Sequence, residues 1–255
     1  MDLATIVGVL LAFGGLFGAQ VMEGGNPASL MLPAPMLLVV CGTLGAAMAS
    51  GILKDATGLP KQAIRAFTAK RSESGALVET VVGLAERARR EGLLALEDAA
   101  KSVTDPFLRR GLEMAIDGTD PEELGDILHG EVDAKRKADK AAAKIFVDMG
   151  GYAPTIGIIG TVMGLVHVLS SLSDPSKLGE LIAGAFVATL WGVMLANVVF
   201  LPMGARLKRV SELECEQMEL AIEGILAIQA GANPRLVAQK LKSLLPPGEA
   251  EKKAA

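Results

Sequence analysis

Two threonines stand at matching depths in the last two apolar stretches of the chain. Thr161 lies 13 residues before Asp174, and Thr189 lies 9 residues after Glu180. At 1.5 Å of rise per helical residue, these depths differ by only about 6 Å. Both hydroxyls are therefore positioned to line one polar point near the middle of a membrane. The alternative is that each hydroxyl bonds a carbonyl one turn back in its own helix.

Two prolines near the ends of the same stretches form a second candidate. Pro154 and Pro202 each remove a helix hydrogen bond and free the carbonyl four residues back. Membrane helices tolerate this where other groups or water satisfy the carbonyl. The pair predicts a hinge or an inner mouth, and a simple kink at the helix end is the alternative.

Ionisable groups are nearly absent from the apolar stretches. Such groups usually mark transport paths when they lie in a membrane, and the only titratable candidate is His167, which we interpret as a packing residue. If ions pass here, the titrating group is expected to come from another polypeptide. Cys41 and Cys215 make no disulfide framework or metal-ligand set. No enzyme triad, metal site, cofactor site or nucleic-acid surface is expected.

The elements that position these residues are four stretches without Asp, Glu, Lys or Arg. They are residues 3–22, 24–53, 149–173 and 181–205. Each meets or exceeds the roughly 20 apolar residues that span about 30 Å of hydrocarbon. The predicted fold class is all-α, with two transmembrane hairpins and a helical cytoplasmic domain between helices 2 and 3. The four transmembrane helices are expected at about 3–22, 30–53, 151–173 and 181–203.

Basic residues orient the chain. Of its 25 Lys and Arg residues, 16 lie in residues 54–150 and 8 in residues 206–255. The positive-inside rule therefore places both termini and the middle segment in the cytoplasm, with the first apolar run retained as a span. The predicted domains are hairpins at 1–53 and 149–205, a cytoplasmic domain at 54–148, and a cytoplasmic helix and tail at 206–255.

A short amphipathic helix is expected just after the second span. Ile64 and Phe67 share one face, and basic residues lie around the rest of it. These are Lys61, Arg65, Lys70 and Arg71. Such a helix suits the headgroup region; packing on its own domain is the open alternative.

Further helices follow in the cytoplasmic segment. The spacing predicts a helix over residues 74–91 and a resumed helical pattern over 93–103, with Gly92 either a break or a weak point. Asp105 and Asp120 each precede a proline as capping residues. The second cap predicts a helix that runs to Asp148 and into the third span.

Small residues form stripes on the third and fourth spans. They recur every three to four residues, and they include Ala153, Gly157, Gly160, Gly164, Ala185, Ala188, Gly192 and Ala196. Such stripes let helices approach closely in lipid. They are expected either to pack this hairpin or to face a partner helix.

These motifs together resemble the flagellar stator A subunit, the MotA/PomA family. The resemblance rests on GYAPTIGIIGTVMGL at 151–165, LSDP at 172–175, ATLWG at 188–192 and NVVFLP at 197–202. It also includes RREGLLALE at 89–97 and LAIQAGANPR at 226–235. These runs are spread over nearly the whole chain.

The resemblance implies a partner and a task. In this family a B subunit supplies a membrane Asp, five A subunits surround two B subunits, and flow of H⁺ or Na⁺ turns the A ring. The rotor protein FliG contacts the cytoplasmic loop. By position, Thr161 and Thr189 match the ion-path threonines, and Pro154 and Pro202 match the functional prolines. The bacterial inner membrane is the implied location.

Charged residues of the loop match those implicated at the rotor. They are Arg89 or Arg90, with Glu97. Arg90 and Glu97 would share a helix face if Gly92 does not break the helix. Exposed charges steer a contact that forms repeatedly, and a solvated helix face is the plain alternative.

Two other functions compete with the stator. An envelope energiser of the ExbB/TolQ type normally has three spans, so the four-span count argues against it. A membrane scaffold that conducts no ions is the third reading.

Overall fold

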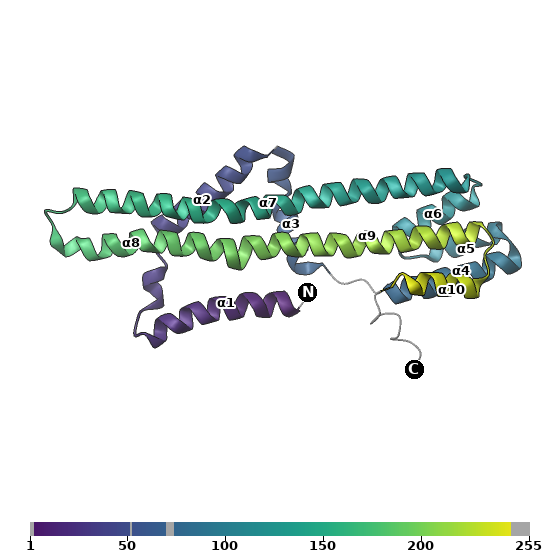
Figure 1. The fold of residues 1–255 in the computed structure, drawn as a ribbon, viewed down its shortest axis with the longest axis horizontal. Coiled ribbons are helices and arrows are strands. Elements are labelled where there is room, and N and C mark those ends of the chain that lie inside the picture. The colour runs from purple at the N-terminus through teal and green to yellow at the C-terminus, as the bar shows by residue number, and fades with distance from the viewer. Residues whose placement is uncertain (1–2, 52, 70–73, 246–255) are drawn as a thin grey trace. The chain divides into compact units, whose positions relative to one another are not determined.

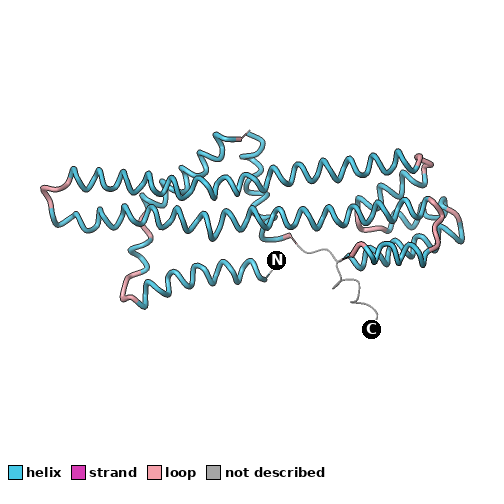
Figure 2. The backbone as a smooth tube through the Cα atoms, viewed as in Figure 1, coloured by secondary structure: helices cyan, strands magenta, loops and turns pink. Residues whose placement is uncertain are grey.

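The computed structural model describes residues 3–51, 53–69 and 74–245, and the regular structure in those ranges is helical (Figure 2). This confirms the predicted all-α class. The helices are α1 (Leu3–Met22), α2 (Pro33–Ser50), α3 (Leu53–Thr68), α4 (Ser74–Glu91), α5 (Glu97–Ser102), α6 (Pro106–Ile116), α7 (Pro121–Ser170), α8 (Pro175–Met194), α9 (Leu201–Gln229) and α10 (Pro234–Ser243). Short turns are η1 (Pro27–Leu30), η2 (Leu93–Leu96) and η3 (Leu195–Phe200).

Four helical runs are long and apolar enough to cross a membrane. They begin and end at Thr5–Met22, Pro33–Ser50, Pro121–Ser170 and Pro175–Gln229. The second run is shorter than the predicted 30–53. Its N-cap, Leu32, is extended because Pro33 begins the helix, and Gly51 leaves helical geometry at φ −118°.

The chain forms two compact units by its contacts. The first unit comprises Met1–Lys70 and Asp139–Val210, and the second comprises Arg71–Ala138 and Ser211–Ala255. The sequence predicts a cytoplasmic domain at residues 54–148. The first unit takes in both ends of that range, because α3 and the segment of α7 from Asp139 onward pack against other residues of the first unit.

The packing of α3 explains that difference. Its apolar side, with Leu59, Ala63, Ala66 and Phe67, lies in one cluster with Ala47, Ala143, Phe146, Met149, Met203 and Leu207. Lys61 and Ile64 remain exposed on the other side of the helix. Of the predicted basic residues around this helix, Lys70 and Arg71 lie outside the described residues.

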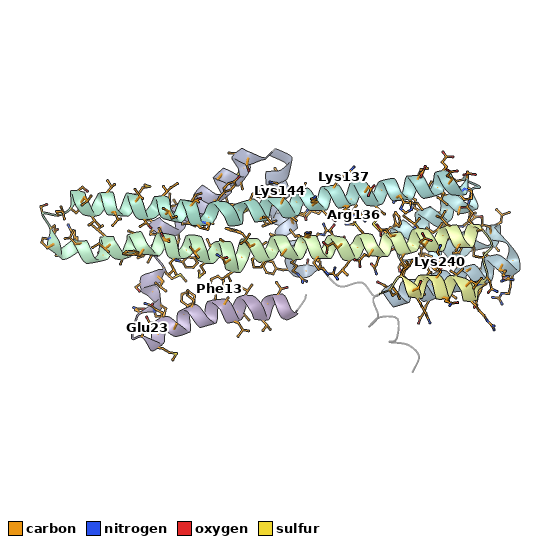
Figure 3. All side chains as sticks on the ribbon, viewed as in Figure 1. Phe13, Glu23, Arg136, Lys137, Lys144 and Lys240 are labelled. Carbon is orange, nitrogen blue, oxygen red and sulfur yellow. The ribbon has the colours of Figure 1, made fainter. Side chains whose placement is uncertain are left out.

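A second cluster in the first unit joins α8 to η1. The indole N–H of Trp191 donates to the carbonyl of Leu30 at 2.6 Å, and Trp191 is buried. Phe13 of α1, which Figure 3 labels, packs against the same cluster. No residue of the apolar window Thr5–Met22 is buried. The exposed surface of α1 is therefore available to contact lipid or another protein.

The second unit has its own core. It is built from α4, α6, the start of α7, the end of α9, and α10, and its fully buried side chains include Val81, Leu96, Leu108, Leu112, Leu124, Leu128, Ile222, Ile225 and Leu241. Both predicted caps are present. The Asp105 carboxylate accepts from the Leu108 N–H at 2.8 Å, and that of Asp120 accepts from Glu122 N–H at 2.9 Å. From the second cap, α7 continues into the third span as predicted. Residues 246–255, the end of the predicted C-terminal segment 206–255, lie outside the described residues.

Candidate functional site

The two threonines meet where α7 and α8 run side by side (Figure 1). The hydroxyls of Thr161 and Thr189 are in hydrogen-bond contact with each other. Thr161 also donates across the helix pair to the Ala185 carbonyl at 2.9 Å, and Thr189 reaches the Gly157 carbonyl at 3.3 Å. Thr161 lies 3.3 Å from that same carbonyl, one turn back in its own helix. The shared polar point that the depths predict is therefore present.

Four oxygens meet at this point, two hydroxyl and two carbonyl. Each hydroxyl has one proton and two lone pairs, so donation leaves lone pairs free to accept or to coordinate. Oxygen ligands suit hard cations. The cluster carries no negative charge, so it can replace part of a cation's hydration but cannot neutralise the cation.

Glycines bring the two helices into backbone contact around the threonines. A Cβ added to Gly192 would lie 2.5 Å from the Ala153 carbonyl oxygen and 3.1 Å from Gly157 Cα. One added to Gly157 would lie 2.9 Å from the Ala188 carbonyl oxygen. No side chain fits in this gap, and the close approach sets the positions of the hydroxyls.

Gly160 and Gly164 continue this contact toward the far end of the pair. Added Cβ atoms would lie 2.7 Å from Ala188 Cβ and 2.6 Å from Ala185 Cβ, respectively. The stripes of α7 and α8 therefore pack against each other within one hairpin. The large side chains point the other way, and those exposed on the part of α7 that follows Gly157 are Ile158, Ile159, Val162, Met163, Leu165, Val166 and Leu169.

The prolines are accompanied by a helix irregularity that the sequence had not revealed. Ahead of Pro202, residues Leu195–Phe200 form a π-helical turn, and the Leu201 N–H donates to the carbonyl of Ala196, five residues back. Such π turns are rare and often occur at functional sites. Since Pro202 cannot donate a fourth-residue bond, the wider turn re-registers the helix just before it.

Pro154 lies opposite this turn. Pro154 and the π-helical turn both lie between two close contacts of the helix pair. One contact joins Gly157 and Gly192. The other joins Gly150 and Leu201, where a Cβ added to Gly150 would lie 2.5 Å from Leu201 Cδ2. Irregular hydrogen bonding in α7 and in α8–α9 is thus concentrated at one level of the pair.

A partly buried ion pair at the base of the first unit was also missed by sequence reasoning. Arg65 of α3 binds Asp139 of α7 through two bonds of 2.5 and 3.1 Å, and Asp139 is 8% exposed. Arg206 of α9 donates to the Ala66 carbonyl at 2.5 Å. One signal was available: Asp139 falls four residues before the buried Ala143 and seven before Phe146, on the apolar face of its helix.

The charged residues predicted at a rotor surface lie on the α4–η2–α5 segment of the second unit. Gly92 has φ +86° and ends α4 at Glu91. Arg90 and Glu97 therefore belong to different helices, and the single continuous face considered from the sequence is not formed. All three predicted residues, Arg89, Arg90 and Glu97, are exposed.

Their ion pairing differs. Lys101 binds both Glu97 at 3.4 Å and Asp98 at 3.2 Å. The side-chain hydrogen bond that Lys101 donates to Asp98, followed by the one that it donates to Glu97, raises the pKa of Lys101. Arg89 and Arg90 form no ion pair with any residue that the structure describes. Two cations are thus left free to meet anions from elsewhere.

The remaining candidates contribute little. His167 is exposed, and its imidazole has no hydrogen-bond partner among the described residues. Both cysteines are free, Cys41 exposed and Cys215 buried. Within the described part of the chain, no group of three or more His, Cys, Asp and Glu side chains is arranged to hold a metal ion.

Two family models match the chain. The model described as MotA/TolQ/ExbB proton channel family matches residues 99–220. The model described as Motility protein A N-terminal matches residues 6–92.

Whole proteins match over nearly the full length. Motility protein A of Bacillus subtilis is 38% identical over 96% of this chain and 92% of its own. Chemotaxis protein PomA of Vibrio alginolyticus is 32% identical over 98% of this chain and 97% of its own. The structure of the flagellar MotAB stator complex from Bacillus subtilis contains a chain that superposes with a TM-score of 0.90 and 37% identity, covering 98% of this chain and 99% of that one.

Proposed function

Since this chain belongs to the MotA/TolQ/ExbB proton channel family and is a stator A subunit of the MotA/PomA type, we propose that the oxygen cluster at Thr161 and Thr189 lines its ion path. The single observation that carries this proposal is the convergence of the two hydroxyls on the Gly157 and Ala185 carbonyls in mid-helix. A cation that sheds water there finds oxygen ligands from both helices.

The missing negative charge defines the partner. Residues 149–173 and 181–205 contain no Asp or Glu, so the charge that binds and releases H⁺ or Na⁺ comes from a B subunit with an Asp on its membrane helix. The relative in the MotAB stator complex supports this pairing. A carboxylate beside the four oxygens completes a site that neither chain makes alone.

Uncovered apolar surface supports assembly into a ring. The exposed large side chains of α7, together with Phe186 and Val193 of α8, form a surface that one chain leaves open. Contiguous apolar surface of this kind is covered by lipid or by protein. We assign it to neighbours in a homopentamer around two B subunits, in the bacterial inner membrane with both termini cytoplasmic.

The prolines then act where the ring must move. Pro154 and the π-turn before Pro202 lie at one level of the α7–α8 pair, between two close contacts. Helix segments with a missing or shifted bond bend more easily than regular ones. We assign this level as the bend that accompanies ion release, while the cytoplasmic charges Arg89, Arg90 and Glu97 deliver torque to FliG.

A conservative variant tests the ion path. Thr161→Val keeps the side-chain shape and removes the hydroxyl, so the Ala185 carbonyl loses its cross-helix donor. A hydrogen bond worth about 1.4 kcal/mol corresponds to about a tenfold change, and we expect ion flux in proteoliposomes of the A–B complex to fall by about that factor. Thr155→Val is the matched control, because among the described residues the Thr155 hydroxyl bonds only the Tyr152 carbonyl of its own helix, at 2.7 Å.

Two outcomes would contradict the proposal. One is equal flux and equal ion preference for Thr161→Val and Thr155→Val in complexes of unchanged mass. The other is substantial flux through vesicles that contain this chain without a B subunit. The second outcome would show that this chain conducts ions by itself and needs no B subunit. A non-conducting scaffold would show no flux even with the B subunit.

A further inference from the structure

The hydroxyl of Thr43, on the second span, is buried and has no hydrogen-bond partner among the described residues. Thr43 is 0% exposed and lies on the buried side of α2 with Val39 and Ala47. This burial comes from the chain itself and needs no partner subunit. A hydroxyl without a partner in a protein interior is costly, so its presence calls for a physical explanation.

Other hydroxyls of the first unit bond the backbone of their own helix. Ser50, Thr68 and Thr155 each donate to a carbonyl three or four residues back, at distances of 2.7 to 3.0 Å. The corresponding acceptor for Thr43 is the Val39 carbonyl, and Thr43 makes no such bond. Its hydroxyl therefore faces the helices that pack on this side of α2.

The contacts between α2 and α7 fix the level of Thr43 along the hairpin. A Cβ added to Gly160 would lie 2.9 Å from Leu38 Cδ2, and a Cβ added to Gly42 would lie 2.9 Å from Ile156 Cγ2. A step of four residues forward in α2 thus matches a step of four residues back in α7. Thr43, one residue beyond Gly42, lies beside the turn of α7 that precedes Ile156. That turn contains the helix proline.

The packing of α2 along α8 places Thr43 at the π-helical turn as well. Met36 of α2 packs in the cluster that includes Val198. Leu44 packs in the cluster that includes Val199. Because Thr43 lies between Met36 and Leu44, it is level with the π-helical turn, which lies opposite the proline of α7.

The π-helical turn leaves two carbonyls without their regular donors. The Leu201 N–H donates to Ala196, so it is lost to the carbonyl of Asn197, four residues back. Pro202 has no N–H to donate to the carbonyl of Val198. In membrane helices, groups freed in this way are satisfied by neighbouring hydroxyls or by ordered water.

We propose that Thr43 binds a buried water molecule, which bridges its hydroxyl to the carbonyls that the π-helical turn leaves without regular donors. Water has two protons and two lone pairs, so it can donate to a carbonyl of the turn while it pairs with the hydroxyl. The inference rests on the proposed function, in which the level of Pro154 and the π-helical turn bends during ion release. As this level bends, the water exchanges one carbonyl for the next and keeps them hydrogen-bonded. Thr43 is a positioning residue, which holds the water and does not touch the ion.

The sign of a stability change tests the water. Thr43→Val keeps the shape of the side chain and removes its hydroxyl. Because the variant loses the bridge, we expect the melting temperature of the A–B complex to fall by about 2–4 °C. An unpaired hydroxyl would give the opposite sign, since replacing it with a methyl group removes a buried polar group without the loss of a bond.

Ion flux tests the role in the bend. In proteoliposomes of the A–B complex, Thr43→Val should lower the flux about fivefold and leave the preference between H⁺ and Na⁺ unchanged. Thr43→Ser, which keeps the hydroxyl, should conduct like the wild type. Thr155→Val is the matched control for flux and melting temperature, because the Thr155 hydroxyl bonds within its own helix. A cryo-EM map should show a water within hydrogen-bond distance of Thr43 Oγ1 in the wild type and none in Thr43→Val.

Contrary results overturn different claims. A rise in the melting temperature of Thr43→Val overturns the water site, and unchanged flux overturns its role in the bend. A changed ion preference would make Thr43 a ligand of the ion, and loss of flux in Thr43→Ser would assign the effect to packing of the methyl group; either result overturns the proposal. Equal flux for Thr161→Val and wild type contradicts the proposed function, whereas a lowered melting temperature of Thr43→Val still supports the water site.

Discussion

The α7–α8 contact of the first unit and the α4–η2–α5 segment of the second treat polar groups in opposite ways. At the contact, the hydroxyls of Thr161 and Thr189 lie within hydrogen-bond distance of each other and of carbonyls on the facing helix, and glycines remove the space between the helices. On the α4–η2–α5 segment, Arg89 and Arg90 point to solvent without an ion pair among the described residues, and Leu94 is 76% exposed.

The proposed function accounts for this difference. A site that replaces the hydration of a cation needs its oxygens fixed before the ion arrives, because disorder there weakens every ligand. A surface that binds and releases a partner many times must keep its groups available, and internal pairing would compete with the partner. Under the proposed function, the internally bonded hydroxyls belong to the ion path, and the exposed unpaired arginines belong to the rotor contact.

The largest effect is expected from filling the helix contact. Gly192→Val places a branched side chain where even a Cβ would lie 2.5 Å from the Ala153 carbonyl oxygen. Overpacking against backbone has no flexible neighbour that can yield, so the hairpin should lose more than about 3 kcal/mol. Thermal unfolding of the A–B complex and its mass in detergent measure this.

Gly151→Val is the control for that change. Nothing lies within 4 Å of a Cβ at Gly151 on the same α7 helix. If the two variants melt alike, the close approach of α7 and α8 does not hold the threonines in place, and the comparison between the two regions loses its structural basis.

A smaller effect is expected from breaking the partly buried ion pair of the first unit. Asp139→Asn leaves Arg65 without its carboxylate, and loss of one partner of a buried pair costs about 3 kcal/mol. Asp148→Asn breaks a surface ion pair, in which Lys144 Nζ lies 2.6 Å from Asp148 Oδ2. This change should lower the free energy of unfolding by less than about 1 kcal/mol. Melting temperatures of both variants in the A–B complex give the ranking. Equal shifts would mean that the Arg65–Asp139 pair behaves as a surface pair.

Much of the membrane half could be predicted because its determinants are local. Charge-free runs define the spans, and a rise of 1.5 Å per residue places Thr161 beside Thr189. Asp105 and Asp120 each indicate the start of a helix, because their side chains cap the first backbone N–H groups. These features depend on residues a few positions apart, and the helix geometry supplies the rest.

The features that the sequence did not predict depend on residues far apart in the chain or on which of two backbone conformations a residue adopts. Arg65 and Asp139 are 74 residues apart, so no periodicity links them. For α3, its own sequence allowed a position in the headgroup region or packing on the cytoplasmic domain. The structure instead packs its apolar side in the cluster around Phe146 of the first unit, whose residues come from distant parts of the chain. At Gly92 the sequence permits continuation or a break, and burial of Leu96 beyond it favours the break. The π-turn before Pro202 is one of several ways to accommodate a missing N–H.

The smallest effect concerns a surface pair beside the proposed rotor contact. The hydrogen bonds that Lys101 donates to Asp98 and Glu97 raise its pKa above the ordinary 10.5. A group whose pKa is raised on folding stabilises the folded state below its unfolded pKa and ceases to do so as pH rises through the folded value. Lys101→Gln should therefore lower the melting temperature of the A–B complex slightly at pH 7. The difference from wild type should shrink only as the pH rises beyond the ordinary 10.5 and through the raised pKa of folded Lys101. Lys137→Gln, another exposed lysine, which Figure 3 labels, is the control. A Lys101→Gln difference that persists at alkaline pH would show that this position acts through packing. The contrast with the internally bonded hydroxyls of the first unit would then rest on Arg89, Arg90 and Leu94 alone.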